Sequence, residues 1–186
     1  MVLRPWAALA ACLLIVAFGS FGWGMARFFS RPAGMTPGTN LVKWLGVVFV
    51  VLHLWKVMFS QAPITWIWAG CLLYLCSIAL YWWALDANRR RPLSAVFSPD
   101  TPEHLVTSGP YAYVRHPLYT SYLLAWLAGV IASGEPWLLV TFVAMALIYR
   151  RAVQQEEGKF EASQLSAAYQ AYRARTGAFL PRLTRE

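Results

Sequence analysis

The feature that most constrains this 186-residue chain is a series of long apolar runs separated by charged segments. Three of these runs, 6–29, 41–60 and 64–85, contain about 20 residues each, enough for a helix to cross a hydrocarbon core of about 30 Å. Only 13% of the residues are charged and 59% are hydrophobic, whereas about 25% of a soluble domain is charged. The sequence therefore predicts an all-α integral membrane protein.

Two shorter apolar runs, 118–133 and 137–149, follow and are joined by Gly134-Glu135-Pro136, which cannot continue a helix comfortably. We interpret them as a tight helical hairpin whose second arm continues past Tyr149 as a polar helix. The total is then about five transmembrane helices. A signal peptide is a weaker interpretation of the first run, because only Arg4 precedes it and the run is too long.

The distribution of basic residues predicts an orientation. With five spans, nearly all of the 16 Lys and Arg residues fall on one side of the membrane. The positive-inside rule then places the N-terminus outside and the C-terminus in the cytoplasm. The small size and short loops favour a prokaryotic inner membrane. The positive net charge of +8 follows from this bias, so we expect lipid contacts and neither a nucleic-acid partner nor an obligate protein partner.

The composition changes at about Asp86, which predicts two regions. Residues 1–86 form a three-helix transmembrane scaffold, and 87–186 form a catalytic region with a cytoplasmic loop, the short hairpin and an amphipathic C-terminal helix. The three cysteines lie within apolar runs without metal-ligand spacing, so no metal is expected. His53 and Lys56 interrupt the second run; we expect His53 to be neutral with one hydrogen bond and Lys56 to reach the interface.

Two polar segments carry the candidate chemistry. In the first, Gly109-Pro110 makes a turn and Arg115-His116-Pro117 leads into the fourth apolar run. His116 and Tyr119 lie one helical turn apart and can line a polar pocket, although such a loop could also contact lipid phosphates. The second segment places Arg150 and Arg151 before Glu156 and Glu157 on one helix. These residues could bind a cofactor and an anionic substrate, or form solvated salt bridges.

The run from Ser108 to Tyr119, followed by a hairpin and by the Arg, Glu-Glu and Tyr-x-x-Tyr elements, resembles the isoprenylcysteine carboxyl methyltransferase family, which is grouped with the phospholipid methyltransferases. The resemblance covers about residues 100–181. It implies a cytoplasmic site for S-adenosylmethionine, released as S-adenosylhomocysteine, and a lipophilic substrate that enters from the bilayer. The implied cofactor-binding residues are His104, Leu105, Val106, Tyr111, His116, Pro117, Leu118, Tyr119 and either Glu156 or Glu157.

The resemblance also implies that an arginine one turn before the glutamate approaches the reacting end of the substrate. Arg151 is the nearest candidate, with Arg150 as a second substrate-binding residue, but Arg151 lies five residues before Glu156 and some 140° from it around an ideal helix. A π-bulge at Gln154-Gln155 would restore the alignment; otherwise Arg150 shares a face with Glu157.

We therefore predict an integral membrane methyltransferase that acts on a carboxylate such as that of isoprenylcysteine, with Arg151 and Glu156 as catalytic residues. A phospholipid amine or a small thiol is the alternative acceptor. The alternative of another class is a non-enzymatic membrane protein.

Overall fold

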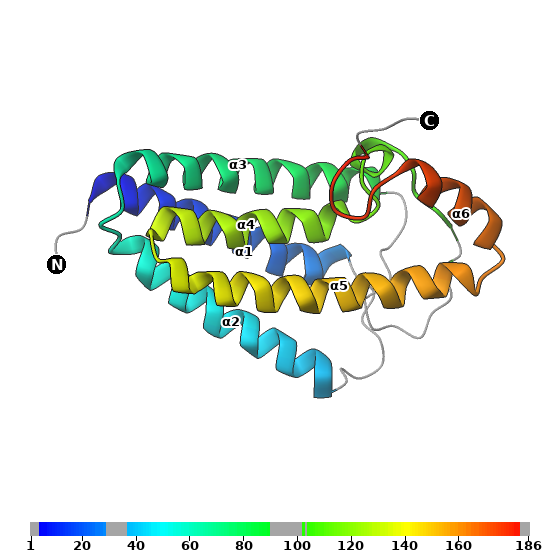
Figure 1. Ribbon diagram of the computed structural model, residues 1–186, viewed down its shortest axis with the longest axis horizontal. Helices are drawn as coiled ribbons and strands as arrows, with labels where there is room; N and C mark the ends of the chain where they lie inside the picture. Colours follow the sequence, from blue (N-terminus) through cyan, green and yellow to red (C-terminus); the bar gives the residue numbers. More distant parts are fainter. Residues whose placement is uncertain (1–3, 29–36, 90–101, 103, 183–186) are drawn as a thin grey trace.

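The computed structural model describes residues 4–28, 37–89, 102 and 104–182 of the chain. Within these residues the elements are six α-helices and two short 3₁₀ helices (Figure 1). In chain order they are α1 (Pro5–Phe28), α2 (Pro37–Met58), α3 (Ile64–Ala87), η1 (Gly109–Ala112), α4 (Pro117–Ser133), η2 (Pro136–Leu138), α5 (Leu139–Glu161) and α6 (Ser166–Arg175).

The bounds of these helices follow from local sequence signals. A proline opens α1, α2, α4 and η2, a position where its missing N–H costs nothing. Gly134 ends α4 with a φ of 70°, a left-handed conformation that favours glycine. The predicted hairpin at Gly134-Glu135-Pro136 is confirmed, and so is the continuation of α5 beyond Tyr149 to Glu161.

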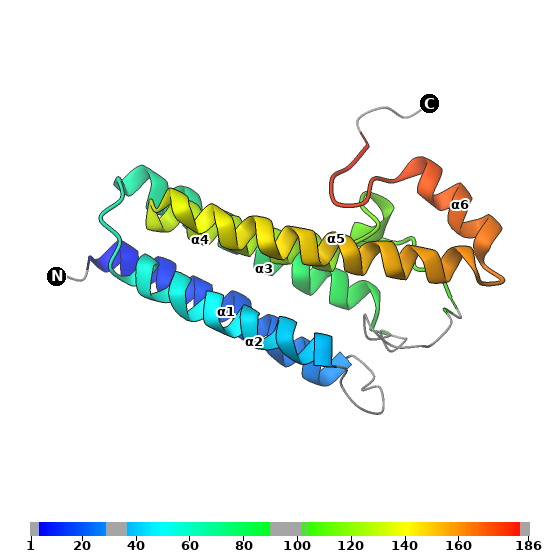
Figure 2. The same cartoon turned by 60° about the horizontal axis from the view of Figure 1, so that its bottom comes forward.

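Helices α1 to α5 run up and down between two ends. We call the end with the α2–α3 connection and the α4–α5 turn the turn end, and the end where α3 stops and α4 begins the polar end. Helix α4 lies at the centre and contacts α1, α2, α3 and α5. Helix α2 lies near α4 and α5 at the turn end and diverges from α5 toward the polar end (Figures 1 and 2).

Small residues allow α4 to pack this closely. A Cβ atom added to Gly70 of α3 would lie 2.5 Å from the Cβ of Ala132 and 2.9 Å from the carbonyl oxygen of Ala128. The two helices therefore touch backbone to backbone, a common packing mode in membranes, where apolar side chains gain little by leaving lipid.

The prediction of an all-α membrane protein is confirmed. In the described residues, four helices are long and apolar enough to cross a membrane, and α4 is a shorter apolar helix of 17 residues. Exposed tryptophans and aliphatic residues cover the outside of these helices, as expected for a lipid-facing surface. The orientation of the bundle and the division at residue 86 remain predictions.

Candidate active site

The polar residues predicted from the sequence converge at the polar end, where the first turn of α4 faces the polar half of α5. His116 is the residue before α4 and Tyr119 lies in its first turn, while Glu156 and Glu157 come from α5. Ring contacts of Tyr119 and Tyr122 with Tyr149 hold the two helices together just below these polar groups, with centroids 5.5 and 5.6 Å apart. The site is thus mounted on two packed helices.

The His116 imidazole lies between the two carboxylates. Its Nδ1 is 3.5 Å from Glu156 Oε2, and its Nε2 is 3.1 Å from Glu157 Oε1. Only a protonated imidazole carries an N–H on both nitrogens. Burial lowers the pKa of His116, but the hydrogen bonds and negative charges of Glu156 and Glu157 raise it more, so that the pKa lies above its ordinary value near 6.5.

Glu157 is held in place by a second cation. Arg115 Nε donates to Glu157 Oε1 over 2.9 Å, and the two side chains are only 8% and 12% exposed. The same guanidinium donates to the carbonyl oxygen of Thr176. Glu157 therefore faces both Arg115 and His116, and its charge is compensated within the protein.

Glu156 has a different environment from its neighbour. Its Oε1 accepts a hydrogen bond from the Tyr119 hydroxyl over 2.7 Å, and its side chain is 26% exposed. Within the described residues no arginine forms an ion pair with it; His116 Nδ1 lies 3.5 Å from its Oε2. Of the two glutamates, Glu156 is thus the one whose charge is available to a cationic or hydroxyl-bearing ligand.

The segment after α6, residues 176–182, folds back over the start of α4. The backbone N–H groups of Arg115 and His116 donate to the carbonyl oxygens of Gly177 and Ala178 over 2.8 and 3.1 Å. The Phe179 ring lies 6.4 Å from the His116 ring. A Cβ atom at Gly177 would lie 1.8 Å from the carbonyl oxygen of Leu180, so this turn requires glycine. The segment fixes the backbone of the histidine that bridges the glutamates.

Tyr111 of η1 is anchored from two sides. Its hydroxyl accepts a hydrogen bond from Asn88 Nδ2 over 2.9 Å, and its carbonyl oxygen accepts one from the Tyr172 hydroxyl over 2.6 Å. Burial raises the pKa of Tyr111; the Asn88 hydrogen bond lowers it, and the charge of Glu156 raises it. Because the hydroxyl accepts from Asn88, its own hydrogen remains available to a further acceptor.

The structure does not bring all predicted site residues together. His104, Leu105 and Val106 lie before η1 in a partly buried segment that is neither helix nor strand, and within the described residues no hydrogen bond joins them to His116 or the glutamates. Pro117 is buried at the first position of α4, and Leu118 packs against the main apolar core.

The two arginines expected at the substrate also lie apart from the glutamates. Arg150 and Arg151 are exposed on α5, and neither has an ion-pair or hydrogen-bond partner among the described residues. Helix α5 is regular from Leu139 to Glu161, so the π-bulge considered at Gln154-Gln155 is not observed and Arg151 points away from the face of Glu156.

Sequence reasoning missed two residues that position the site. Arg115 lies within the Ser108–Tyr119 run but its pattern suggested no role, although its Nε lies 2.9 Å from Glu157 Oε1. Asn88 lies just beyond the third apolar run and is 7% exposed. A buried asparagine at the end of a membrane helix is a signal that could have found it, because such an amide needs hydrogen-bond partners.

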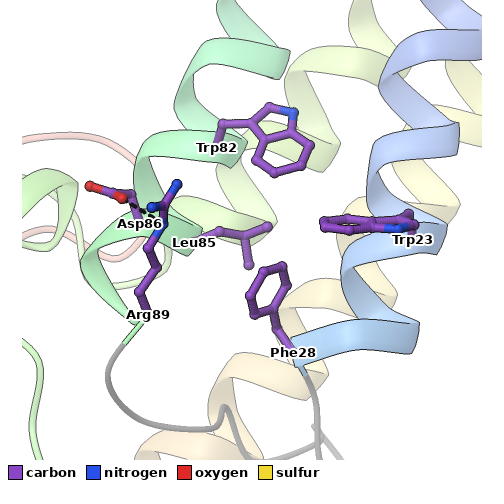
Figure 3. A pocket seen from close by; sticks show the side chains of 6 residues that line it. All are labelled: Trp23, Phe28, Trp82, Leu85, Asp86 and Arg89. Atoms are coloured by element: carbon purple, nitrogen blue, oxygen red, sulfur yellow. Dashed lines mark ion pairs between the residues drawn. The ribbon is translucent and has the colours of Figure 1, made fainter.

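A separate pocket of about 350 Å³ lies between α1 and α3 near the polar end (Figure 3). Trp23 and Phe28 of α1 face Trp82 and Leu85 of α3 across it, and the exposed Asp86–Arg89 ion pair forms its rim. It contains none of the predicted site residues.

The fold and the site define a membrane-embedded helical protein with an acidic and histidine-containing cluster at one membrane surface. A profile of the phospholipid methyltransferase family matches residues 65–168, from α3 to α6. The chain belongs to this family, which confirms the resemblance inferred from the run between Ser108 and Tyr119.

Two curated bacterial proteins are similar to this chain. The cobalt-zinc-cadmium resistance protein CzcN of Cupriavidus metallidurans is 30% identical over 83% of this chain and 73% of its own length. The nickel-cobalt-cadmium resistance protein NccN of Alcaligenes xylosoxydans xylosoxydans is 31% identical over 76% of this chain and 64% of its own length. A search of the solved structures found no significant match.

Proposed function

We propose that this protein transfers a methyl group from S-adenosylmethionine to a lipophilic acceptor at the membrane surface. The observation that carries the proposal is the cluster of His116, Tyr119, Glu156 and Glu157. These side chains come from the two polar segments that the resemblance rests on, which are far apart in the sequence and meet in the structure. Family membership supports methyl transfer as the reaction.

The residues at the cluster fit the chemistry of the donor. S-adenosylmethionine carries an ammonium group and ribose hydroxyls, which a carboxylate can bind, and an adenine ring, which an aromatic side chain can contact. We assign Glu156 to the ammonium or ribose, because both glutamates face His116 but only Glu157 is also compensated by Arg115. Tyr111 supplies an aromatic face and an available hydroxyl hydrogen. When bound, the donor supplies an activated methyl group on a sulfonium.

The main work of the protein is then to orient two reactants and to exclude water. The Arg115–Glu157 pair and residues 176–182 hold His116, and His116 with Tyr119 orients the Glu156 carboxylate. The predicted binding roles of His104, Leu105 and Val106 remain part of the proposal, since these residues precede η1 and its anchored Tyr111.

For the acceptor, the geometry favours an amine of a membrane lipid over the carboxylate expected from the sequence. The carboxylate required Arg151 beside Glu156, and Arg151 is exposed elsewhere on the helix. A lipid ammonium must lose a proton before methylation, and if the donor is bound through its ribose hydroxyls the Glu156 carboxylate can accept this proton. Arg150 and Arg151, just past the apolar part of α5, are proposed to bind the lipid phosphate. A carboxylate and a small thiol remain the alternative acceptors.

The test is binding of S-adenosylhomocysteine to the purified protein by calorimetry, followed by a methylation assay with labelled donor. Glu156→Gln and His116→Ala should each weaken binding at least tenfold, whereas the control Asp86→Asn, an exposed acid in the Asp86–Arg89 pair, should not change it. Extracted lipids, an isoprenylcysteine analogue and a hydrophobic thiol are offered in parallel as acceptors. A folded wild-type protein that binds no donor product would refute the proposal.

The names of the two relatives suggest a physiological setting. We propose that methyl transfer by this chain supports growth in the presence of cobalt, zinc or cadmium. A deletion strain should become sensitive to these ions, and the wild-type gene but not the Glu156→Gln gene should restore growth. Full restoration by Glu156→Gln would instead favour a non-enzymatic membrane protein.

A further inference from the structure

A single side-chain amide connects the end of α3 to the candidate active site. Asn88 is the residue that follows α3, and it is 7% exposed. Its Nδ2 lies 2.8 Å from the carbonyl oxygen of Ala84 and 2.9 Å from the oxygen of the Tyr111 hydroxyl. The two hydrogens of one amide nitrogen are therefore divided between the last turn of α3 and η1.

The contact with Ala84 determines which way the Asn88 amide faces. A backbone carbonyl oxygen can only accept a hydrogen bond, so the Asn88 atom beside it must be Nδ2 and not Oδ1. The second hydrogen of Nδ2 then faces the Tyr111 hydroxyl, which has to accept it. The backbone of α3 thus sets the direction of the hydrogen bond between Asn88 and Tyr111.

A hydroxyl that accepts from Asn88 has to place its own hydrogen elsewhere. Among the described residues, no acceptor is hydrogen-bonded to the hydrogen of the Tyr111 hydroxyl. Burial raises the pKa of Tyr111, the hydrogen bond from Asn88 lowers it and the charge of Glu156 raises it. Tyr111 therefore lies close enough to Glu156 to be influenced by its charge, and it brings a free donor hydrogen to this part of the protein.

The position of η1 is held by contacts that do not involve the Tyr111 hydroxyl. The carbonyl oxygen of Tyr111 accepts from the Tyr172 hydroxyl over 2.6 Å, and its N–H donates to the carbonyl oxygen of Ser108 over 3.3 Å. Gly109 lies directly against α3, because a Cβ atom built on it would be 3.1 Å from the Cβ of Ala87. The amide of Asn88 is thus not the main anchor of η1, and its specific effect is on the hydroxyl.

We propose that Asn88 is a positioning residue of the methyl-donor site, which fixes the Tyr111 hydroxyl as a hydrogen-bond donor to an acceptor atom of S-adenosylmethionine. This inference rests on the proposed function, because Asn88 acts on the bound ligand through Tyr111. An oriented hydroxyl makes its hydrogen bond without the cost of being ordered on binding. Tyr111 then donates and Glu156 accepts, so that the site offers both kinds of partner to the ligand.

The test is the affinity for S-adenosylhomocysteine, measured by calorimetry at about pH 8, well above the ordinary pKa of an aspartate. Tyr111→Phe removes the hydrogen bond and should weaken binding about fivefold to tenfold. Asn88→Asp keeps the size of the side chain but makes it an acceptor, so the Tyr111 hydrogen turns toward it and the affinity should fall at least as far. Asn88→Leu leaves the hydroxyl free to turn to the ligand, so the loss should be only about twofold to threefold.

A purely structural role for Asn88 predicts the opposite order of the two variants. Asn88→Leu removes both hydrogen bonds of the amide, whereas Asn88→Asp retains the one with Tyr111. An affinity of Asn88→Leu as low as that of Asn88→Asp would therefore overturn the proposal. The control is Asn40→Asp, at the only other asparagine of the chain, in the first turn of α2, and it should leave the affinity unchanged.

A double-variant cycle shows whether Asn88 acts through the Tyr111 hydroxyl. In a Tyr111→Phe background, Asn88→Asp should change the affinity less than twofold, and an equal loss with and without the hydroxyl would overturn the proposal. The same cycle with Asn88→Leu serves if Asn88→Asp does not fold, since its smaller loss should also disappear. In each of these outcomes the wild type binds S-adenosylhomocysteine, whereas a wild type that does not bind it refutes the proposed function itself.

Discussion

Replacing Arg115 by methionine should destabilise the polar end of the protein, because it leaves Glu157 buried without its strongest partner. Both side chains of the pair are about nine-tenths buried, and removing one member of a buried ion pair costs about 3–5 kcal/mol. His116 and, at 4.0 Å, Arg173 still face Glu157, so we expect the lower limit, about 3 kcal/mol. For a chain of this size that corresponds to a decrease of about 6–12 °C in Tm.

The assay is thermal unfolding in a mild detergent, with two further variants that isolate the ion pair. Adding Glu157→Gln to Arg115→Met removes the uncompensated charge, so the double variant should recover at least half of the lost Tm. Arg89→Met is the matched control, because the Asp86–Arg89 pair is 61–70% exposed and such pairs contribute at most about 1 kcal/mol. A double variant no more stable than Arg115→Met, or a control as damaging as Arg115→Met, would refute the reasoning.

Three further predictions concern the cluster and the helix packing. Because the pKa of His116 is raised by its carboxylate partners, its stabilising contribution is complete below about pH 6.5 and is lost as the pH rises through the raised pKa; Tm should fall over that range in the wild type but not in His116→Gln. Tyr119→Phe removes a hydrogen bond to Glu156 and should weaken S-adenosylhomocysteine binding about fivefold to tenfold, equivalent to about 1–1.4 kcal/mol, and unchanged calorimetric affinity would argue against this role. Gly70→Ala forces α3 and α4 apart and should cost about 1–3 kcal/mol in thermal unfolding, whereas Gly46→Ala, at a glycine of α2 whose Cβ would meet nothing within 4 Å, should not destabilise the protein; equal Tm values would contradict the close packing.

The sequence alone determined the helices of this protein. Apolar run length sets the number of spans, and proline and glycine mark their ends, as at Pro117 and Gly134. These signals are local, because a helix forms its backbone hydrogen bonds within its own segment and any sufficiently long apolar helix is stable in a bilayer. The polar continuation of α5 past Tyr149 was predictable for the same reason.

The sequence also indicated the residue types of the site. His116, Tyr119 and the Glu156-Glu157 pair were selected before their proximity was known, because polar groups at the ends of short membrane helices gather at one surface. Which glutamate is compensated could not be decided, since adjacent glutamates on a helix differ only in the neighbours they meet.

Only the tertiary structure decided the pairing of charges. Sequence spacing led to Arg151, because residues near each other on one helix are the only contacts that periodicity reveals. The arginine nearest to Glu157 is instead Arg115, which precedes α4, and Asn88 reaches Tyr111 from the end of α3. Such contacts depend on how α3, α4 and α5 pack. Small residues such as Gly70 determine this packing, because they let two helix backbones approach each other closely. The sequence of either helix alone does not show which partner it will approach.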